Sequence, residues 1–75
     1  MKIENFIDNL TDIFEDAKPE AIIPEAKFRD IEGYSSLVAY LIIGMINEEY
    51  NLEFTADDLR KSETIADIFT VIKLK

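Results

Sequence analysis

Two residue types on which much protein chemistry depends are missing from this chain of 75 residues. There is no cysteine, so disulfide bonds and thiolate metal sites are excluded, and there is no histidine, so imidazole catalysis is excluded. Long apolar runs are also missing: residues 37–46 form the longest, about half of the ~20 residues that a membrane-spanning helix needs. The first residues, MKIEN, are acidic and amphipathic, unlike a signal peptide. We therefore expect a cytoplasmic protein without membrane insertion.

Basic residues are scarce relative to acidic ones. The chain has eight Lys and Arg residues and sixteen Asp and Glu residues, which gives a net charge of −8. Such a surface repels phosphate backbones and anionic lipids, so we expect no nucleic-acid partner. It suits a partner with a basic docking patch, although acidity can equally serve solubility alone. The carboxylate clusters lack the spacing of a calcium-binding loop, so we predict no metal site. Catalytic carboxylate pairs need a cleft, for which a chain this short has little room, so we predict no catalytic residue.

A hydrophobic fraction of 48% indicates a folded core, and the length fits a single domain over residues 1–75. In residues 3–15, apolar side chains recur every three or four positions, which predicts an amphipathic helix. A second helix is predicted over residues 36–50, with Ser35 or Ser36 as its N-cap. The connection between them, residues 17–34, is long for so small a domain, and its apolar residues are expected to pin it to the bundle.

Two more helices are predicted after the second one stops near Asn51. The sequence TADD from Thr55 resembles a capping box, and the short helix that it opens is expected to end near Lys61. The sequence TIAD from Thr64 also resembles a capping box and begins the last helix. No segment shows the alternation of a strand. The predicted fold class is therefore all-α: a small bundle of three long helices and one short helix, with a long loop between the first two.

The second predicted helix is apolar on two faces. One face carries a core stripe of Ala39, Ile42, Ile43, Ile46 and Tyr50. The opposite face carries Leu37, Val38, Leu41, Met45 and Glu48. A bundle this small cannot cover a helix on every side, so we expect part of the second face to be exposed and to bind a partner. Cover by the loop or by the first helix, and dimerisation of an otherwise monomeric chain, are the alternatives.

The sequence FRDIEGYSSL, residues 28–37, leads into this helix and ends on two hydroxyl residues. A helix start offers unpaired backbone N–H groups and the positive end of the helix dipole, so an anion attached there is stabilised. Ser36 supplies a hydroxyl to which a phosphate could be joined covalently. Tyr34 and Tyr40 flank this serine, and we expect both to pack near the loop and the helix, with a contact to an attached group as the alternative.

The order of these elements resembles the acyl carrier protein family over essentially the whole chain. Four motifs carry the resemblance: FRDIEGY before the helix, the dipeptide Ser36–Leu37 at its start, EEYNLEF at residues 48–54, and TIADI at residues 64–68. The Ser-Leu dipeptide alone has no value as a signal, but the four motifs occur in order and at the family's spacing.

The resemblance implies that Ser36 is esterified by 4′-phosphopantetheine, which a separate phosphopantetheinyl transferase takes from coenzyme A. It implies partners that load and process an acyl or aminoacyl thioester, and a chain that is not itself an enzyme. The cofactor would supply the sulfur that a chain without cysteine lacks. The bundle interior around Phe6, Ile43, Ile46, Phe54 and Ile68 is a candidate shelter for part of an acyl chain.

Two departures from the family pattern bear on the site. Ser35 replaces the family's aspartate and becomes a rival attachment residue, although the register with Leu37 favours Ser36. Val38 and Leu41 stand where family members are commonly acidic, which indicates a dedicated partner with an apolar contact surface. The alternative function is an unmodified helical interaction module that docks through Val38, Leu41 and Met45.

Overall fold

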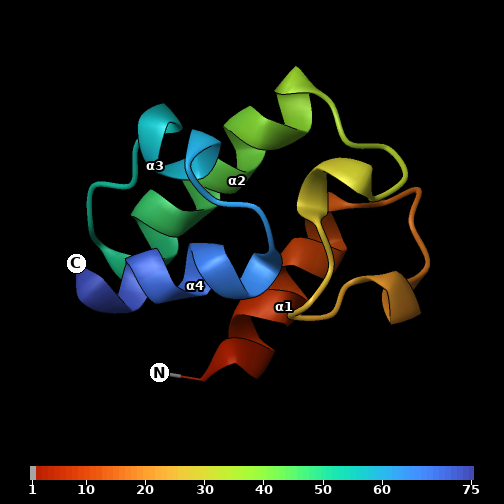
Figure 1. The fold of residues 1–75 in the computed structure, drawn as a ribbon, viewed down its shortest axis with the longest axis horizontal. Helices are drawn as coiled ribbons and strands as arrows, with labels where there is room; N and C mark the ends of the chain where they lie inside the picture. The colour runs from red at the N-terminus through yellow and green to blue at the C-terminus, as the bar shows by residue number, and fades with distance from the viewer. Residues whose placement is uncertain (1) are drawn as a thin grey trace.

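The computed structural model describes residues 2–75 and contains four helices: α1 (Ile3–Ile13), α2 (Ser36–Tyr50), α3 (Ala56–Arg60) and α4 (Ile65–Leu74). Figure 1 shows α2 and α4 crossing the molecule, with α3 beside them and α1 beneath. Within residues 2–75 there is no strand, only one isolated bridge between Lys27 and Thr64. The predicted all-α bundle of three long helices and one short helix is therefore confirmed. None of the helices in this range has the length and apolarity needed to cross a membrane.

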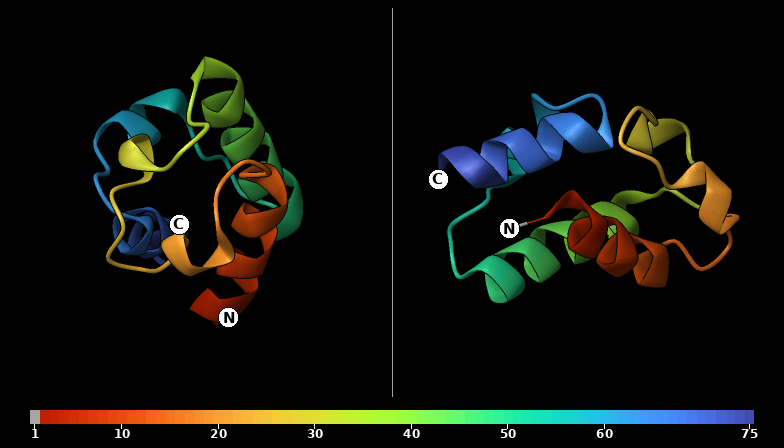
Figure 2. Two further views of the ribbon diagram at one scale, coloured as in Figure 1. Left: turned by 90° about the vertical axis from the view of Figure 1, so that its right-hand side faces the viewer. Right: turned by 90° about the horizontal axis from the view of Figure 1, so that it is seen from below.

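The core is one cluster of buried side chains. Figure 2 shows the arrangement of the helices from two further sides. Near the centre of this cluster the Phe6 ring stacks on Phe69 at a centroid distance of 5.7 Å and meets the edge of Tyr50 at 6.3 Å. Buried side chains come from every helix and from the long loop: Phe6, Leu10, Phe14, Ile22, Phe28, Ile31, Val38, Ile42, Ile46, Phe54, Leu59, Ile65, Ile68, Phe69 and Ile72.

Helix α1 ends two residues earlier than its apolar periodicity predicts. Phe14 leaves the helical conformation, with φ −85° and ψ 71°, while its N–H still donates to the Leu10 carbonyl at 2.9 Å. This change of direction buries the Phe14 side chain in the core, at 2% exposure. Residues Glu15 and Asp16 consequently leave the helix axis and stand exposed at the start of the loop.

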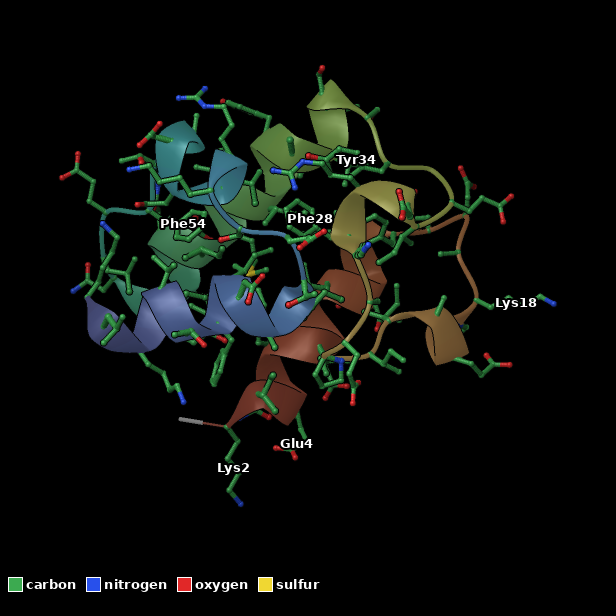
Figure 3. All side chains as sticks on the ribbon, in the orientation of Figure 1. Lys2, Glu4, Lys18, Phe28, Tyr34 and Phe54 are labelled. Atoms are coloured by element: carbon green, nitrogen blue, oxygen red, sulfur yellow. The ribbon has the colours of Figure 1, made fainter. Side chains whose placement is uncertain are left out.

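Apolar side chains pin the long loop, as expected. It contains two short 3-10 turns, Pro19–Ala21 and Phe28–Asp30, that the sequence analysis did not anticipate. Ile22, Phe28 and Ile31 are buried in the core. Figure 3 shows Phe28 in the interior of the molecule, whereas Lys18 extends outward from the loop.

Polar contacts fasten the same loop to α3 and α4. The Ile65 and Ala66 N–H groups, at the start of α4, donate to loop carbonyls at 3.0 and 2.8 Å. The Arg29 guanidinium donates to the carbonyls of Ser62 and Leu59 at 2.7 and 2.9 Å and lies 4.5 Å from the centroid of the neighbouring Phe28 ring. Carbonyls at a helix end are ordinarily unpaired. Arg29 therefore caps α3 while holding the loop that leads to α2.

Asp67 closes the capping box of α4 and gives stability a pH dependence. Its carboxylate accepts hydrogen bonds from the N–H groups of Thr64 and Glu63, each at 3.0 Å, and these bonds hold the pKa of Asp67 below its ordinary value. A lowered folded-state pKa stabilises the fold above the unfolded-state pKa, and this stabilisation is lost as pH falls through the folded-state pKa. Asp67→Asn should therefore lower the free energy of unfolding at pH 7, and this loss should shrink below about pH 4. Urea unfolding of the unaltered protein and of Asp67→Asn at several pH values measures this loss. A difference in unfolding free energy that does not change with pH would contradict the role of the Asp67 carboxylate.

Gly44 lies exposed within α2, and a Cβ atom placed there would meet nothing within 4 Å. No neighbouring helix in residues 2–75 therefore requires this glycine. Gly44→Ala should raise the free energy of unfolding by up to about 1 kcal/mol, because glycine is the weaker helix former. Gly33 is the matched control: its φ of +91° means that Gly33→Ala should instead destabilise. Urea denaturation separates the two, and a loss of stability in Gly44→Ala would show that the position is constrained.

Candidate functional site

A tight turn brings the chain to the start of α2. The Tyr34 N–H donates to the Ile31 carbonyl at 3.1 Å, and Gly33 takes the positive φ that this turn needs. The Tyr34 ring then lies against Phe14 and Phe28, at centroid distances of 6.5 and 5.8 Å. The expected packing of Tyr34 is confirmed. Because Tyr34 directly precedes Ser35 and Ser36, its packing holds the chain in place at the start of α2.

Ser35 is the N-cap of α2, which decides between the two serines considered for that role. Its backbone is extended, with φ −159° and ψ 175°, and its Oγ accepts a hydrogen bond from the Val38 N–H at 3.2 Å. Its carbonyl accepts from the Ala39 N–H at 2.9 Å. The Ser35 hydroxyl thus already has a structural task.

Ser36 is the first residue of α2 and is exposed, as expected. Within residues 2–75 no hydrogen bond engages its hydroxyl, and the N–H groups of Ser36 and Leu37 have no protein acceptor. Ser36 also stands at the positive end of the dipole of this 15-residue helix. The arrangement leaves a free hydroxyl beside two unpaired donors, which suits a covalently attached phosphate group. Figure 1 shows this helix end standing away from the C-terminus and from the start of α1.

The apolar face predicted on α2 is only partly exposed. Leu37 and Leu41 are 65% and 43% exposed, and Glu48 is also exposed, whereas Met45 is half-buried. Val38, which the docking hypothesis placed on the contact surface, is buried instead, at 9% exposure. Val38 belongs to the core cluster and lines the same cavity as Ile13 and Phe14.

Tyr40 also departs from expectation. It does not pack on the loop but is 73% exposed, and it lies four residues after Ser36 in α2. Side chains in a helix point back toward its N-terminus, so the Tyr40 ring shares the side of the turn from which the Ser36 hydroxyl emerges. The expected packing of Tyr40 is therefore wrong, and its alternative, a contact to a group attached at Ser36, stays a prediction.

Two cavities flank the first turns of α2. One, of about 230 Å³, lies toward the end of α1 and includes Ser35, Leu37 and Leu41 in its lining. The other, of about 200 Å³, lies toward α3 and is lined by Arg29, Tyr34, Ala39, Ile43, Ala56, Leu59 and Arg60. Ala39 and Ile43 follow Ser36 by three and seven residues, so they share its face of the helix. Both cavities are thus within the first half of α2, beside the free hydroxyl.

A third cavity, of about 280 Å³, lies at the far end of α2 and is lined by Lys2, Asn5, Asn9, Glu49 and Tyr50. Burial raises the pKa of the Tyr50 phenol, and the Glu49 carboxylate raises it further. Because α2 rises 1.5 Å per residue, Tyr50 is about 20 Å from Ser36 along the helix axis. This cavity is therefore separate from the serine.

Comparison with known families decides the class of this site. The profile of the family described as phosphopantetheine attachment site matches residues 8–72, which include all of the site described above. The chain belongs to this family. The carrier protein resemblance is confirmed, and the prosthetic group of the family is 4′-phosphopantetheine, as expected. The structure fits this group, because α2 offers an exposed hydroxyl and unpaired N–H donors for its phosphate.

No group of three or more Asp and Glu side chains among residues 2–75 is arranged to hold a metal ion. Glu15 and Asp16 line the cavity toward α1, although the sequence alone favoured plain solvated charge for this carboxylate pair.

Proposed function

We propose that Ser36 carries the 4′-phosphopantetheine arm and that the loaded chain presents an acyl or aminoacyl thioester to partner enzymes. One observation carries the proposal: of two adjacent serines, Ser35 is engaged as the helix cap and Ser36 is exposed with an unengaged hydroxyl. Register with Leu37 supports the same choice. When bound, the arm supplies a terminal thiol for the thioester. The chain contributes attachment and presentation, and we propose no catalytic residue.

The residues around Ser36 have distinct tasks in this proposal. The Ser36 and Leu37 N–H groups stabilise the phosphodiester, an exposed interaction of about 0.3–1 kcal/mol. Ser35 keeps the first turn of α2 intact through its bond to Val38. Transfer from coenzyme A requires the Ser36 oxygen to form the new bond to phosphorus while the nucleotide leaves and the hydroxyl proton passes to a base of the transferase.

Shelter for cargo is proposed at the surface rather than in the deep core. Phe6, Ile46, Phe54 and Ile68 are at most 1% exposed and closely packed in the core. Ile43 is the exception among the interior residues considered, since it is half-buried and lines the 200 Å³ cavity toward α3. This cavity is therefore the surface that we propose for an apolar cargo.

We further propose that residues 1–75 form a single carrier domain that works as a cytoplasmic monomer. The net charge of −8 supports this, because identical chains repel one another at low ionic strength and anionic lipid or nucleic acid is repelled as well. Partners would be a phosphopantetheinyl transferase and the enzymes that load and process the cargo.

Incubation with coenzyme A and a broad-specificity phosphopantetheinyl transferase tests this function. We expect the intact mass to rise by one arm and no more. If several transferases leave the mass unchanged while the protein is folded, the better description is the unmodified interaction module, which docks through the exposed part of α2.

A further inference from the structure

We propose that the cavity between the start of α1 and the end of α2 binds a small zwitterion, a ligand that carries a carboxylate and an ammonium group close together as a free α-amino acid does. This helix-end cavity measures about 280 Å³ and is lined by Lys2, Asn5, Asn9, Glu49 and Tyr50. Pockets for drug-sized ligands commonly measure about 300–1,000 Å³, so this one suits a ligand of amino-acid size. The site is additional to Ser36, which lies at the opposite end of α2.

The polar side chains around the helix-end cavity have unused hydrogen-bonding capacity. Among residues 2–75, the carboxamides of Asn5 and Asn9 make no hydrogen bond. In the same range the buried Tyr50 hydroxyl has no hydrogen-bond partner. Buried polar groups in native proteins are ordinarily paired, because leaving one unpaired costs stability. A polar ligand would supply the missing partners.

Opposite charges line the two walls of the cavity. Lys2 directly precedes α1, and Glu49 lies in the last turn of α2. Both residues line the same cavity, yet within the described residues neither of them forms an ion pair. The space between the two charges therefore fits a ligand that brings a carboxylate to Lys2 and an ammonium group to Glu49.

The helix dipoles add a field of complementary sense. The start of α1 is the positive end of its dipole and has no side-chain cap, and the one acidic residue of its first turn, Glu4, does not line the cavity. The end of α2 is the negative end of its dipole, and its last turn holds no basic residue. Lys2 and Glu49 thus each have the sign that their own helix end disfavours. A ligand carboxylate at α1 and an ammonium group at α2 offset both conflicts.

Tyr50 is the rigid member of the helix-end cavity. Its ring meets the Phe6 ring of α1 at a centroid distance of 6.3 Å, so it reaches from α2 toward the wall that carries Lys2. Burial raises the pKa of the Tyr50 phenol and the Glu49 carboxylate raises it further, so the group is a protonated donor at neutral pH. Lys2, Asn5 and Glu49 are exposed and can move to admit a ligand. We expect the phenol to donate to the ligand carboxylate.

Titration of the isotope-labelled protein with L-norvaline tests the helix-end cavity. Two analogues are matched probes: butylamine lacks the carboxylate, and pentanoate lacks the ammonium group. We expect saturable NMR shifts of the Asn5 and Asn9 side-chain amides with L-norvaline. Each analogue should bind about two- to fivefold more weakly, the range that corresponds to one exposed charge pair. Absence of saturable shifts with L-norvaline, or equal binding of all three probes, would overturn the proposal.

Tyr50→Phe gives a readout that a structural role alone would not produce. It removes only the unpartnered hydroxyl, so the free protein should be at least as stable in urea as the unaltered chain, while L-norvaline binds more weakly. Glu49→Gln should weaken binding about two- to fivefold, also without loss of stability. Glu48→Gln is its control, because Glu48 is exposed in the same turn but does not line the cavity. It should bind L-norvaline as the unaltered protein does.

A loss of stability in Tyr50→Phe with unchanged binding would contradict the site, as would equal weakening by the two Glu variants. The titration is repeated on Ser36→Ala, whose altered residue lies about 20 Å away along the α2 axis. This variant should bind L-norvaline normally, and a loss of binding there would also contradict a separate site. Because binding and arm attachment are measured independently, the zwitterion site and the carrier function can each fail alone.

Discussion

Ser36→Ala should abolish phosphopantetheine loading. Since we assign attachment to the Ser36 oxygen, its removal leaves the transferase without an acceptor, and the expected loss is complete rather than partial. The fold should survive, because the Ser36 side chain is exposed and makes no hydrogen bond within residues 2–75. Intact-mass measurement after incubation with coenzyme A and transferase gives the result, and circular dichroism verifies that the variant remains helical.

Ser35→Ala is the matched control for that experiment. It should still accept one arm, but it removes the cap that bonds Val38, at a cost of about 0.5–2 kcal/mol of stability. We thus expect the Ser36 hydroxyl to determine loading and the Ser35 hydroxyl to contribute to stability. Loss of loading in Ser35→Ala with retention in Ser36→Ala would reverse the assignment.

Phe28→Ala should produce the largest loss of stability among the substitutions considered. Phe28 has no exposed surface, packs edge-on against Tyr34, and lies beneath the Arg29 guanidinium. Truncating a buried Phe costs about 3–5 kcal/mol, a large part of the 5–15 kcal/mol that holds a small domain together. We expect the melting temperature to fall by more than about 10 °C. Loading should fall with the folded fraction, because Phe28 packs against the residue that precedes the serines.

Ile23→Ala is the control for Phe28→Ala in the same loop. Ile23 is 46% exposed, so its truncation should cost less than about 1 kcal/mol. Thermal unfolding followed by circular dichroism compares the two. Similar losses in both variants would show that the loop as a whole, rather than the buried Phe28 ring, determines stability.

Helices were predictable because their signals are local. Capping boxes at Thr55 and Thr64 both form as the sequence indicates, and Asn51 ends α2 with a φ of 52°. The end of α1 was not predictable from periodicity, because Phe14 continues the apolar pattern yet is drawn out of the helix into the core. Periodicity reports which side chains are apolar, and tertiary packing decides where the helix stops.

The exposure of the attachment serine was predictable from the sequence, but the exposure of the side chains around it was less so. A hydroxyl at a helix start is visible in the order of residues, so exposed Ser36 was anticipated. The burial of Val38 and the exposure of Tyr40 were not, because α2 is apolar on two faces and the sequence does not state which one α1 covers. Arg29 gave no signal either, since the carbonyls that it caps lie about thirty positions further along the chain.

Fragmentation mass spectrometry of the loaded chain tests the central claim most directly, because it locates the arm on a residue. After incubation with coenzyme A and a phosphopantetheinyl transferase, the peptide spanning residues 30–37 should carry the whole mass gain, and its fragments should assign that gain to Ser36. An arm found on Ser35 or elsewhere, or a folded chain that no transferase modifies, would contradict the account.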